Sequence, residues 1–97
     1  MAEIVYSPNA LANLERLFEY RAKEDPSGAL DAAAAIRTAI DLLASHPLIG
    51  RRVEGDLREL VISYGATGYV ALYRFIAARD QVRVLAMRHQ RELDYPD

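Results

Sequence analysis

Four arginines in the second half of the chain are the side chains best suited to ligand binding. Arg58, Arg74, Arg83 and Arg88 each fall within a stretch of mostly apolar residues that predicts a strand. A charged side chain in such a strand needs either a partner or an open face. Together the four indicate a shallow anion-binding surface, whereas each one alone is also explained by solvation or by an ion pair.

A histidine and several tyrosines extend the set of candidates. His89 ends the last predicted strand, and an imidazole with a pKa near 6.5 suits a general base; alternatively it closes a hydrogen bond at the strand end. The tyrosines could stack on bases, or they reflect strand propensity and packing at the edge of the core. They are Tyr64, Tyr69, Tyr73 and Tyr95.

Other classes of site have no support in the sequence. The chain has no cysteine, no glycine-rich phosphate loop and no Gly-x-Ser-x-Gly motif, and its two histidines, 46 and 89, are too far apart for a metal motif. We therefore expect neither a metal nor another cofactor, and only acid–base chemistry or binding remains.

Size and charge limit the partners further. The 97 residues are 52% hydrophobic, which predicts one domain over residues 1–97. The net charge is −2, and only Lys23 among the 12 basic residues is not arginine. Such a chain is not expected to bind DNA by itself. We find no membrane-spanning stretch and no secretion signal, and expect a cytoplasmic protein.

Hydrophobic periodicity predicts the elements that position these residues. We expect helices over 8–24 and 27–45, and strands over 2–6, 57–63, 69–76 and 81–88. Short connections make the helices an antiparallel hairpin and the late strands antiparallel. The fold class is α+β, in the order β-α-α-β-β-β, with the helix hairpin on one face of a small, mainly antiparallel sheet.

The same periodicity predicts which side chains face the core. The first helix should bury Leu11, Leu14, Leu17 and Phe18, and the second should bury Leu30, Ala33, Ile36, Ile40 and Leu43. In the middle late strand, Tyr69, Ala71, Tyr73 and Phe75 point one way and Val70, Leu72, Arg74 and Ile76 the other. One face of the sheet should therefore stay partly open and carry arginine.

Motifs along nearly the whole chain resemble those of RelE/ParE-type toxins. His46-Pro47-Leu48-Ile49-Gly50-Arg51 resembles the HP-x-x-G-R element after the second helix, and Leu57-Arg58-Glu59-Leu60 the strand that follows. Residues 69–75 resemble the Y-x-x-x-Y-R strand, and residues 80–92 the last strand with its H-x-R-E tail. This resemblance implies the toxin of a type II toxin–antitoxin pair, neutralised by a cognate, ParD-like antitoxin.

The resemblance leaves the target open. ParE-like members poison DNA gyrase, and RelE-like members cut mRNA on the ribosome. The acidic chain with its single lysine favours the ParE-like interpretation, because a ribosome-bound nuclease sits among phosphates. In that case no residue is catalytic, and the target-binding candidates are Arg74, Arg83, Arg88, Arg91 and Tyr95.

Two alternatives remain. A ribosome-dependent nuclease would use Arg58, Arg74, Arg88 and His89 as its site, with His89 as the base. A homologue that has lost toxicity would only bind its antitoxin. In every case an antitoxin segment should cover the apolar stripe of Leu14, Leu17 and Phe18 and the open edge of the sheet, by docking of a helix in a groove or by strand addition.

Overall fold

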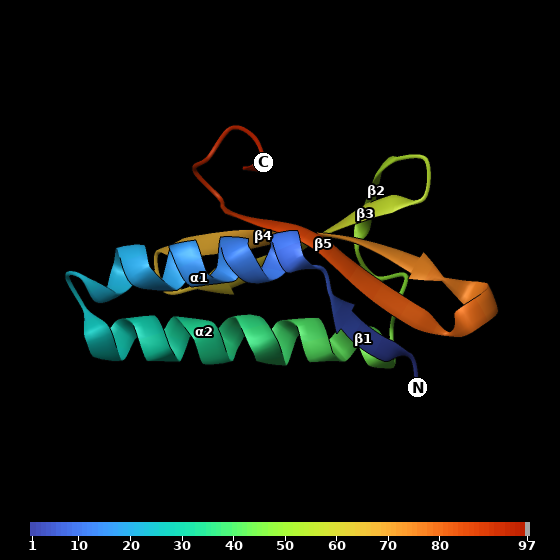
Figure 1. Ribbon diagram of the computed structural model, residues 1–97, viewed down its shortest axis with the longest axis horizontal. Helices are drawn as coiled ribbons and strands as arrows, with labels where there is room; N and C mark the ends of the chain where they lie inside the picture. Colours follow the sequence, from blue (N-terminus) through green and yellow to red (C-terminus); the bar gives the residue numbers. More distant parts are fainter. Residues whose placement is uncertain (97) are drawn as a thin grey trace.

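The computed structural model describes residues 1–96 and shows a helix pair on one face of a five-stranded sheet (Figure 1). The predicted α+β architecture is confirmed. The elements are β1 (Glu3–Tyr6), α1 (Pro8–Ala22), α2 (Pro26–Asp41), the 3-10 turn η1 (Leu42–Ala44), β2 (Arg51–Glu54), β3 (Leu57–Tyr64), β4 (Thr67–Ile76), the 3-10 turn η2 (Ala77–Arg79) and β5 (Gln81–His89).

Each helix begins with a residue whose side chain caps it. The Ser7 hydroxyl accepts a hydrogen bond from the Ala10 amide, and the Asp25 carboxylate accepts one from the Gly28 amide, both at 3.0 Å. A proline follows each cap at the start of the helix, where its missing N–H costs nothing. The predicted C-terminal ends, at residues 24 and 45, were too late, since α1 ends at 22 and α2 at 41.

The strand order is β1-β5-β4-β3-β2, with β1 parallel to β5 and the other neighbours antiparallel. Strand β2 was not predicted. All four of its residues are exposed, so it lacks the alternation of apolar and polar residues that reveals a half-buried strand. It is held as a hairpin with β3 through a turn in which Gly55 has a φ of 55°.

The core lies between the sheet and the helices, and Leu17, Ile36, Ile40 and Leu43 are buried as predicted. The buried faces are nevertheless turned slightly from the predicted ones. Leu11 and Leu30 are 53% and 63% exposed, and Ala33 is also exposed, so these three predictions were wrong. The buried residues of α2 are instead Gly28, Ala29, Ala32, Ile36 and Ile40. The small side chains at its N-terminal end allow α2 to pack closely, while the larger Leu30 points to solvent.

A bulge in β5 fixes the position of α1. Leu72 pairs with Ala86 and Tyr73 with Val84, which leaves Leu85 without a partner on β4. The Leu85 carbonyl accepts hydrogen bonds from the side chains of Ser7 and Asn9, both at 3.1 Å. The start of α1 is thereby anchored on β5.

A buried asparagine adds a second anchor between the same two elements. Asn13 of α1 is only 4% exposed, and its Oδ1 accepts a hydrogen bond of 2.9 Å from the Met87 amide. Buried polar groups of this kind are normally paired. The two anchors together set how α1 lies over β5.

Candidate functional site

The register of the sheet divides the predicted nuclease residues between its two faces. Arg58 pairs with Tyr73 and His89 with Tyr69, and both tyrosines are buried beneath the helices. Arg74 and Arg88 lie on β4 and β5 with the opposite side-chain direction, on the face away from the helices. The structure does not bring these four side chains together.

Arg58 holds the segment that follows α2. Its Nη1 donates hydrogen bonds to the carbonyls of Leu48 and Gly50, at 3.0 and 2.8 Å. Beside it, the Tyr73 hydroxyl donates to the Pro47 carbonyl at 2.8 Å and accepts from the Gly50 amide at 2.9 Å. Hydrogen bonds from Arg58 and Tyr73 therefore fix the backbone of the HP-x-x-G-R element between α2 and β2, although only Gly50 within it is buried.

The face away from the helices carries arginines, as predicted. Arg74 and Arg83 are paired across β4 and β5. Arg74 forms a 3.0 Å ion pair with Asp56, and Arg83 donates to Gln81 at 2.8 Å. The Arg74 and Asp56 side chains are 41% and 66% exposed, so this pair contributes little to stability and is readily replaced by a binding partner.

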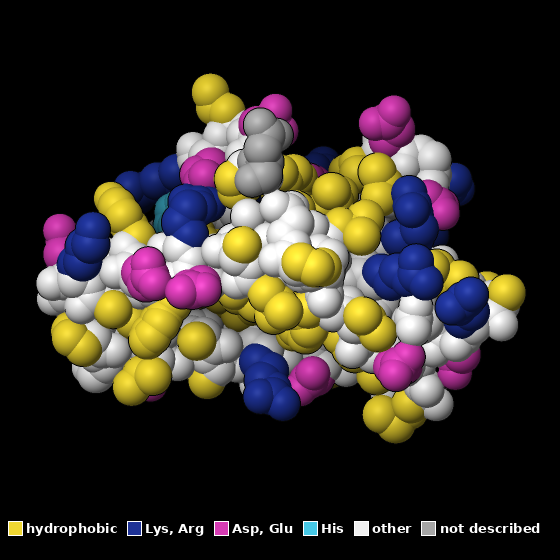
Figure 2. All heavy atoms as spheres, viewed as in Figure 1, with side chains coloured by type: hydrophobic (Ala, Val, Ile, Leu, Met, Phe, Trp, Pro, Cys, Tyr) yellow, Lys and Arg dark blue, Asp and Glu magenta, His cyan; other side chains and the backbone are white. Residues whose placement is uncertain are grey.

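Lysine and arginine side chains lie at both ends of the molecule. In Figure 2 one group is at the right, over the β2–β3 hairpin and the adjoining ends of β4 and β5, and another is at the left, whereas apolar side chains are spread over the helix pair.

Arg88 and Tyr95 belong to a partly buried cluster that holds the C-terminal tail, residues 90–96, against the sheet. Arg88 donates to the Glu92 carbonyl at 2.7 Å, and its guanidinium lies 5.2 Å from the centre of the Tyr95 ring. The Tyr95 hydroxyl donates to Glu59 at 2.6 Å, and Arg51 donates to the same carboxylate at 2.7 Å. We call Arg51, Glu59, Arg88 and Tyr95 the tail cluster.

Glu59, only 8% exposed, is the centre of the tail cluster. Burial by itself would raise the pKa of Glu59, but hydrogen bonds from Tyr95 and Arg51 and the charges of Arg51 and Arg88 outweigh it and lower this pKa. Burial and the Glu59 carboxylate together raise the pKa of Tyr95. Sequence reasoning missed Glu59, although an acid within a mostly apolar strand was a signal of a buried partner.

His89 has both ring nitrogens engaged. Its Nδ1 accepts a 3.0 Å hydrogen bond from the Arg91 amide, and its Nε2 contacts the Thr67 hydroxyl. Since Nδ1 is an acceptor, the ring is neutral and carries its proton on Nε2. Burial lowers the pKa of His89, and the charges of Arg91 and Arg21 lower it further against the opposing effect of Glu92.

The tyrosines of β4 are not exposed and so offer no surface on which a base could stack. Tyr69 and Tyr73 are 3% and 0% exposed. Tyr69 instead packs edge-to-face on His89, with ring centres 5.5 Å apart. These tyrosines are core residues, in line with the alternative interpretation.

A cleft of about 730 Å³ lies beside His89, between the C-terminal half of α1 and the end of β5. Most of its lining side chains are charged, and they include Arg91, which the structure thus separates from the arginines of the opposite face. The lining residues are Arg16, Leu17, Tyr20, Arg21, Glu24, Asp25, Tyr69, His89, Arg91 and Glu92. Arg16 and Glu92 form an ion pair of 3.0 Å across it.

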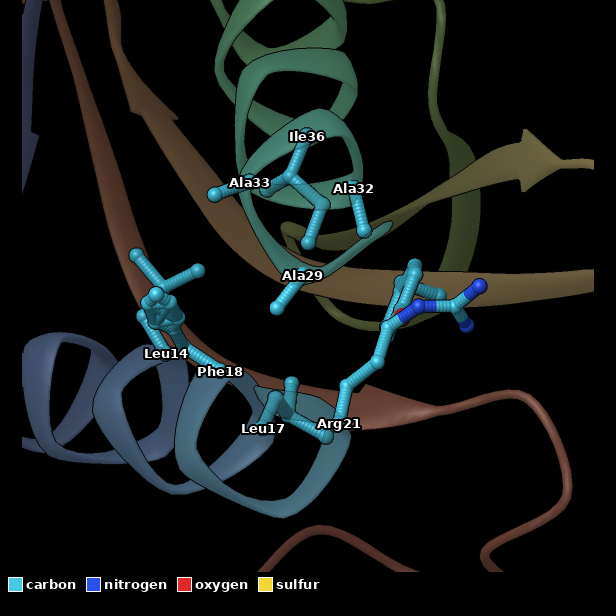
Figure 3. A pocket seen from close by; sticks show the side chains of 9 residues that line it. Leu14, Leu17, Phe18, Arg21, Ala29, Ala32, Ala33 and Ile36 are labelled. Carbon is cyan, nitrogen blue, oxygen red and sulfur yellow. The ribbon is translucent and has the colours of Figure 1, made fainter. Parts of the chain in front are cut away.

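A shallow apolar groove between α1 and α2 contains the candidate antitoxin-binding residues (Figure 3). Its free volume is only about 20 Å³, so it suits the face of a docked element better than a whole inserted side chain. It is lined by Leu14, Leu17, Phe18, Arg21, Ala29, Ala32, Ala33, Ile36 and Tyr69. Arg21, which sequence reasoning did not single out, lines both the groove and the cleft.

Within residues 1–96, no group of three or more histidine or acidic side chains is arranged to hold a metal ion. No helix in this range is long and apolar enough to cross a membrane.

Comparison with known proteins identifies the family. The family described as "ParE toxin of type II toxin-antitoxin system, parDE" matches residues 4–94. Among curated proteins, Toxin RelE3 of Caulobacter vibrioides is 35% identical over 95% of this chain and 98% of its own length. Toxin RelE2 of the same organism is 34% identical over 96% of this chain and all of its own length.

Solved structures show the same fold. The chromosomal ParDE toxin–antitoxin system from P. aeruginosa matches with a TM-score of 0.75 and 19% identity, over 92% of this chain and 96% of that chain. The intact E. coli RelBE toxin–antitoxin complex matches with a TM-score of 0.66 and 14% identity, over 95% of this chain and all of that chain. The chain belongs to the ParE toxin family of type II toxin–antitoxin systems, within the broader RelE/ParE group.

Proposed function

We propose that this toxin acts by binding DNA gyrase and does not cut mRNA. The observation that carries this proposal is the separation of Arg58 and His89 from Arg74 and Arg88 by the thickness of the sheet. A nuclease that holds a phosphate with arginines and removes a proton with a base needs these groups around one reacting atom.

The state of His89 supports the same conclusion. A general base needs a free lone pair aimed at its substrate. The lone pair of His89 is on Nδ1, and it already accepts the Arg91 amide. The ring therefore serves to close the end of β5 in this fold.

The gyrase-binding surface that we propose is the arginine-bearing face of the sheet together with the C-terminal tail. Arg74 and Arg83 are half-buried and supply donors on that face, where their present partners are the side chains of Asp56 and Gln81. Arg88 and Tyr95 contribute by holding the tail in place, because both are engaged in the tail cluster. Interfaces of this kind concentrate their binding energy in a few arginine and aromatic anchors.

We further propose that a cognate antitoxin covers the groove between α1 and α2. Leu14, Leu17 and Phe18 face it from α1, opposite the alanines of α2 (Figure 3). An apolar groove between two helices suits the apolar face of an amphipathic helix. The ParDE and RelBE structures of the same fold are complexes of a toxin with its antitoxin, which supports such a partner for this chain.

One experiment separates the two targets. The purified chain is added to a gyrase supercoiling assay and, in parallel, to a translating extract in which the ends of the mRNA are mapped. We expect loss of supercoiling or accumulation of cleaved DNA, and intact mRNA. The RelE names of the curated relatives make mRNA cleavage the competing result, and cleavage at codon-defined positions would overturn the proposal.

A further inference from the structure

Arg21 has an unusual environment at the end of α1. Within residues 1–96, its Nε is the one buried side-chain nitrogen or oxygen without a hydrogen-bond partner, and no acidic group there forms an ion pair with its guanidinium. The guanidinium lies over the Tyr64 ring, 5.2 Å from its centre. This stacking fixes the head group but leaves its donors unused.

The position of Arg21 joins two surfaces. It lines the apolar groove together with Leu14 and Phe18, and it lines the polar cleft together with His89. In Figure 3 its side chain extends to the end of the groove opposite Leu14, and its nitrogens point away from the apolar residues. A segment that lies along the groove would therefore end at this guanidinium.

Two of the acids that line the cleft with Arg21 are committed elsewhere. The Asp25 carboxylate caps α2 by accepting the Gly28 amide. The Glu92 carboxylate accepts from Arg16 and from the His89 amide. These two groups therefore hold structure in place, and neither one neutralises Arg21.

We propose that Arg21 is a recognition residue for a carboxylate of the antitoxin, from an aspartate or glutamate that follows the apolar side chains in the groove. This inference rests on the proposed docking of the antitoxin between α1 and α2. From Leu14 to Arg21 is seven residues, or about 10 Å along a helix. A helical partner would thus carry its acid about two turns away from the apolar residue that contacts Leu14.

A single carboxylate fits this place better than a nucleic acid. Glu24, Asp25 and Glu92 line the adjoining cleft and would repel a run of phosphates. One carboxylate at the end of the groove can bind the Arg21 guanidinium without extending toward these acids. The apolar lining on the other side also matches a protein segment.

The test uses the protein that copurifies when the adjacent open reading frame is co-expressed with this chain. Its dissociation constant is measured for the wild-type toxin and for Arg21→Gln, Arg21→Lys and Lys23→Gln. The last is the matched control, because Lys23 is an exposed cation at the same helix end that lines neither surface. We expect Arg21→Gln to weaken binding about 10- to 100-fold, the size of a lost charge-assisted hydrogen bond.

The two other variants report on the nature of the contact. Lys23→Gln should change the dissociation constant less than about twofold, since a surface charge contributes little. Arg21→Lys should fall between wild type and Arg21→Gln, because it keeps the charge but loses the planar fork. Binding by Arg21→Gln should also depend less on salt than binding by the wild type.

A second measurement introduces the changes in the partner instead of the toxin. Each acid of the partner is changed to its amide, and one of these variants should lose affinity for wild-type toxin but not for Arg21→Gln. If every amide variant and Arg21→Gln bind like wild type while Leu14→Asp does not, the role of Arg21 is overturned and docking in the groove survives. If the partner does not bind wild-type toxin at all, the proposed antitoxin pairing itself fails.

Discussion

The phenolic hydroxyl of Tyr95 donates a hydrogen bond of 2.6 Å to the Glu59 carboxylate and fastens the C-terminal tail to strand β3. The same carboxylate accepts Arg51 at 2.7 Å, so one side chain joins β2, β3 and the tail. The tail therefore belongs to the folded structure, and one buried acid connects its end to β3.

Replacing Glu59 should weaken the attachment of both strand β2 and the C-terminal tail to β3. Glu59→Gln keeps the size of the side chain but removes its charge. Because hydrogen bonds to a charged group contribute about 1.5–3 kcal/mol, we expect the free energy of unfolding to fall by about that amount. Amide hydrogen exchange should become faster in the tail. Denaturant unfolding and exchange measurements check both effects.

Two further variants test whether the effect is specific to the contacts of Glu59. Tyr95→Phe removes only the bond to the tail and should speed exchange there with a smaller loss of stability. Glu54→Gln removes an exposed acid from the neighbouring strand β2 and should change neither quantity. A Glu59→Gln variant that is as stable as wild type, with a fully protected tail, would contradict the proposed role of the tail cluster.

Stability should also depend on pH through His89. Its pKa in the folded protein is below the usual value of 6.5, mainly because of burial. Below about pH 6.5 the histidine is protonated in the unfolded chain but still neutral in the folded one. The free energy of unfolding is therefore highest above about pH 6.5 and falls as the pH drops. Denaturant unfolding from about pH 7.5 to 5.5 should show this decline, and His89→Gln should flatten it. An equal slope in both proteins would exclude His89 as the cause.

Gly50 offers a steric test of the connection after α2. A Cβ at this position would lie 2.6 Å from the Tyr73 hydroxyl and 2.9 Å from the Glu59 carbonyl. Since neither the buried tyrosine nor the strand can move freely, Gly50→Ala should cost about 1–3 kcal/mol of stability or more. Gly55 is the comparison: a Cβ there meets nothing within 4 Å, and only its φ of 55° opposes the change, at about 1 kcal/mol. Thermal unfolding compares the stability of the two variants. A Gly50→Ala variant more stable than Gly55→Ala would refute the packing argument.

The sequence predicts the elements of this fold better than the pairings between side chains. The caps at Ser7 and Asp25 mark both helix starts, because capping is local chemistry. The rotation of α2 was missed because an alanine-rich helix has apolar residues on several sides, and only contact with the sheet selects Ala29 and Ala32 over Leu30.

The candidate site was harder to predict for the same reason. The split of Arg58 from Arg74 follows from strand alternation and was within reach of the sequence. The contact of Tyr95 with Glu59 spans 36 residues and depends on how the tail turns back after β5. The unpaired Nε of Arg21 depends on the rotation of α1, and no pattern in the sequence marks it.

The two proposed surfaces should be separable by mutation, because they lie on opposite sides of the sheet. Arg74→Gln together with Arg83→Gln should reduce gyrase inhibition about tenfold or more with little effect on antitoxin affinity and stability, since each of these half-buried arginines contacts only one polar side chain of the toxin. Leu14→Asp should do the reverse, because a charge in the groove opposes an apolar partner but is remote from the arginines. Growth arrest with and without the co-expressed antitoxin, and supercoiling assays on the purified variants, report each effect. Arg37→Gln, on the exposed side of α2, is the control that should alter neither. If the arginine pair and Leu14→Asp lose the same activity, target and antitoxin share one surface and the division proposed for this toxin is wrong.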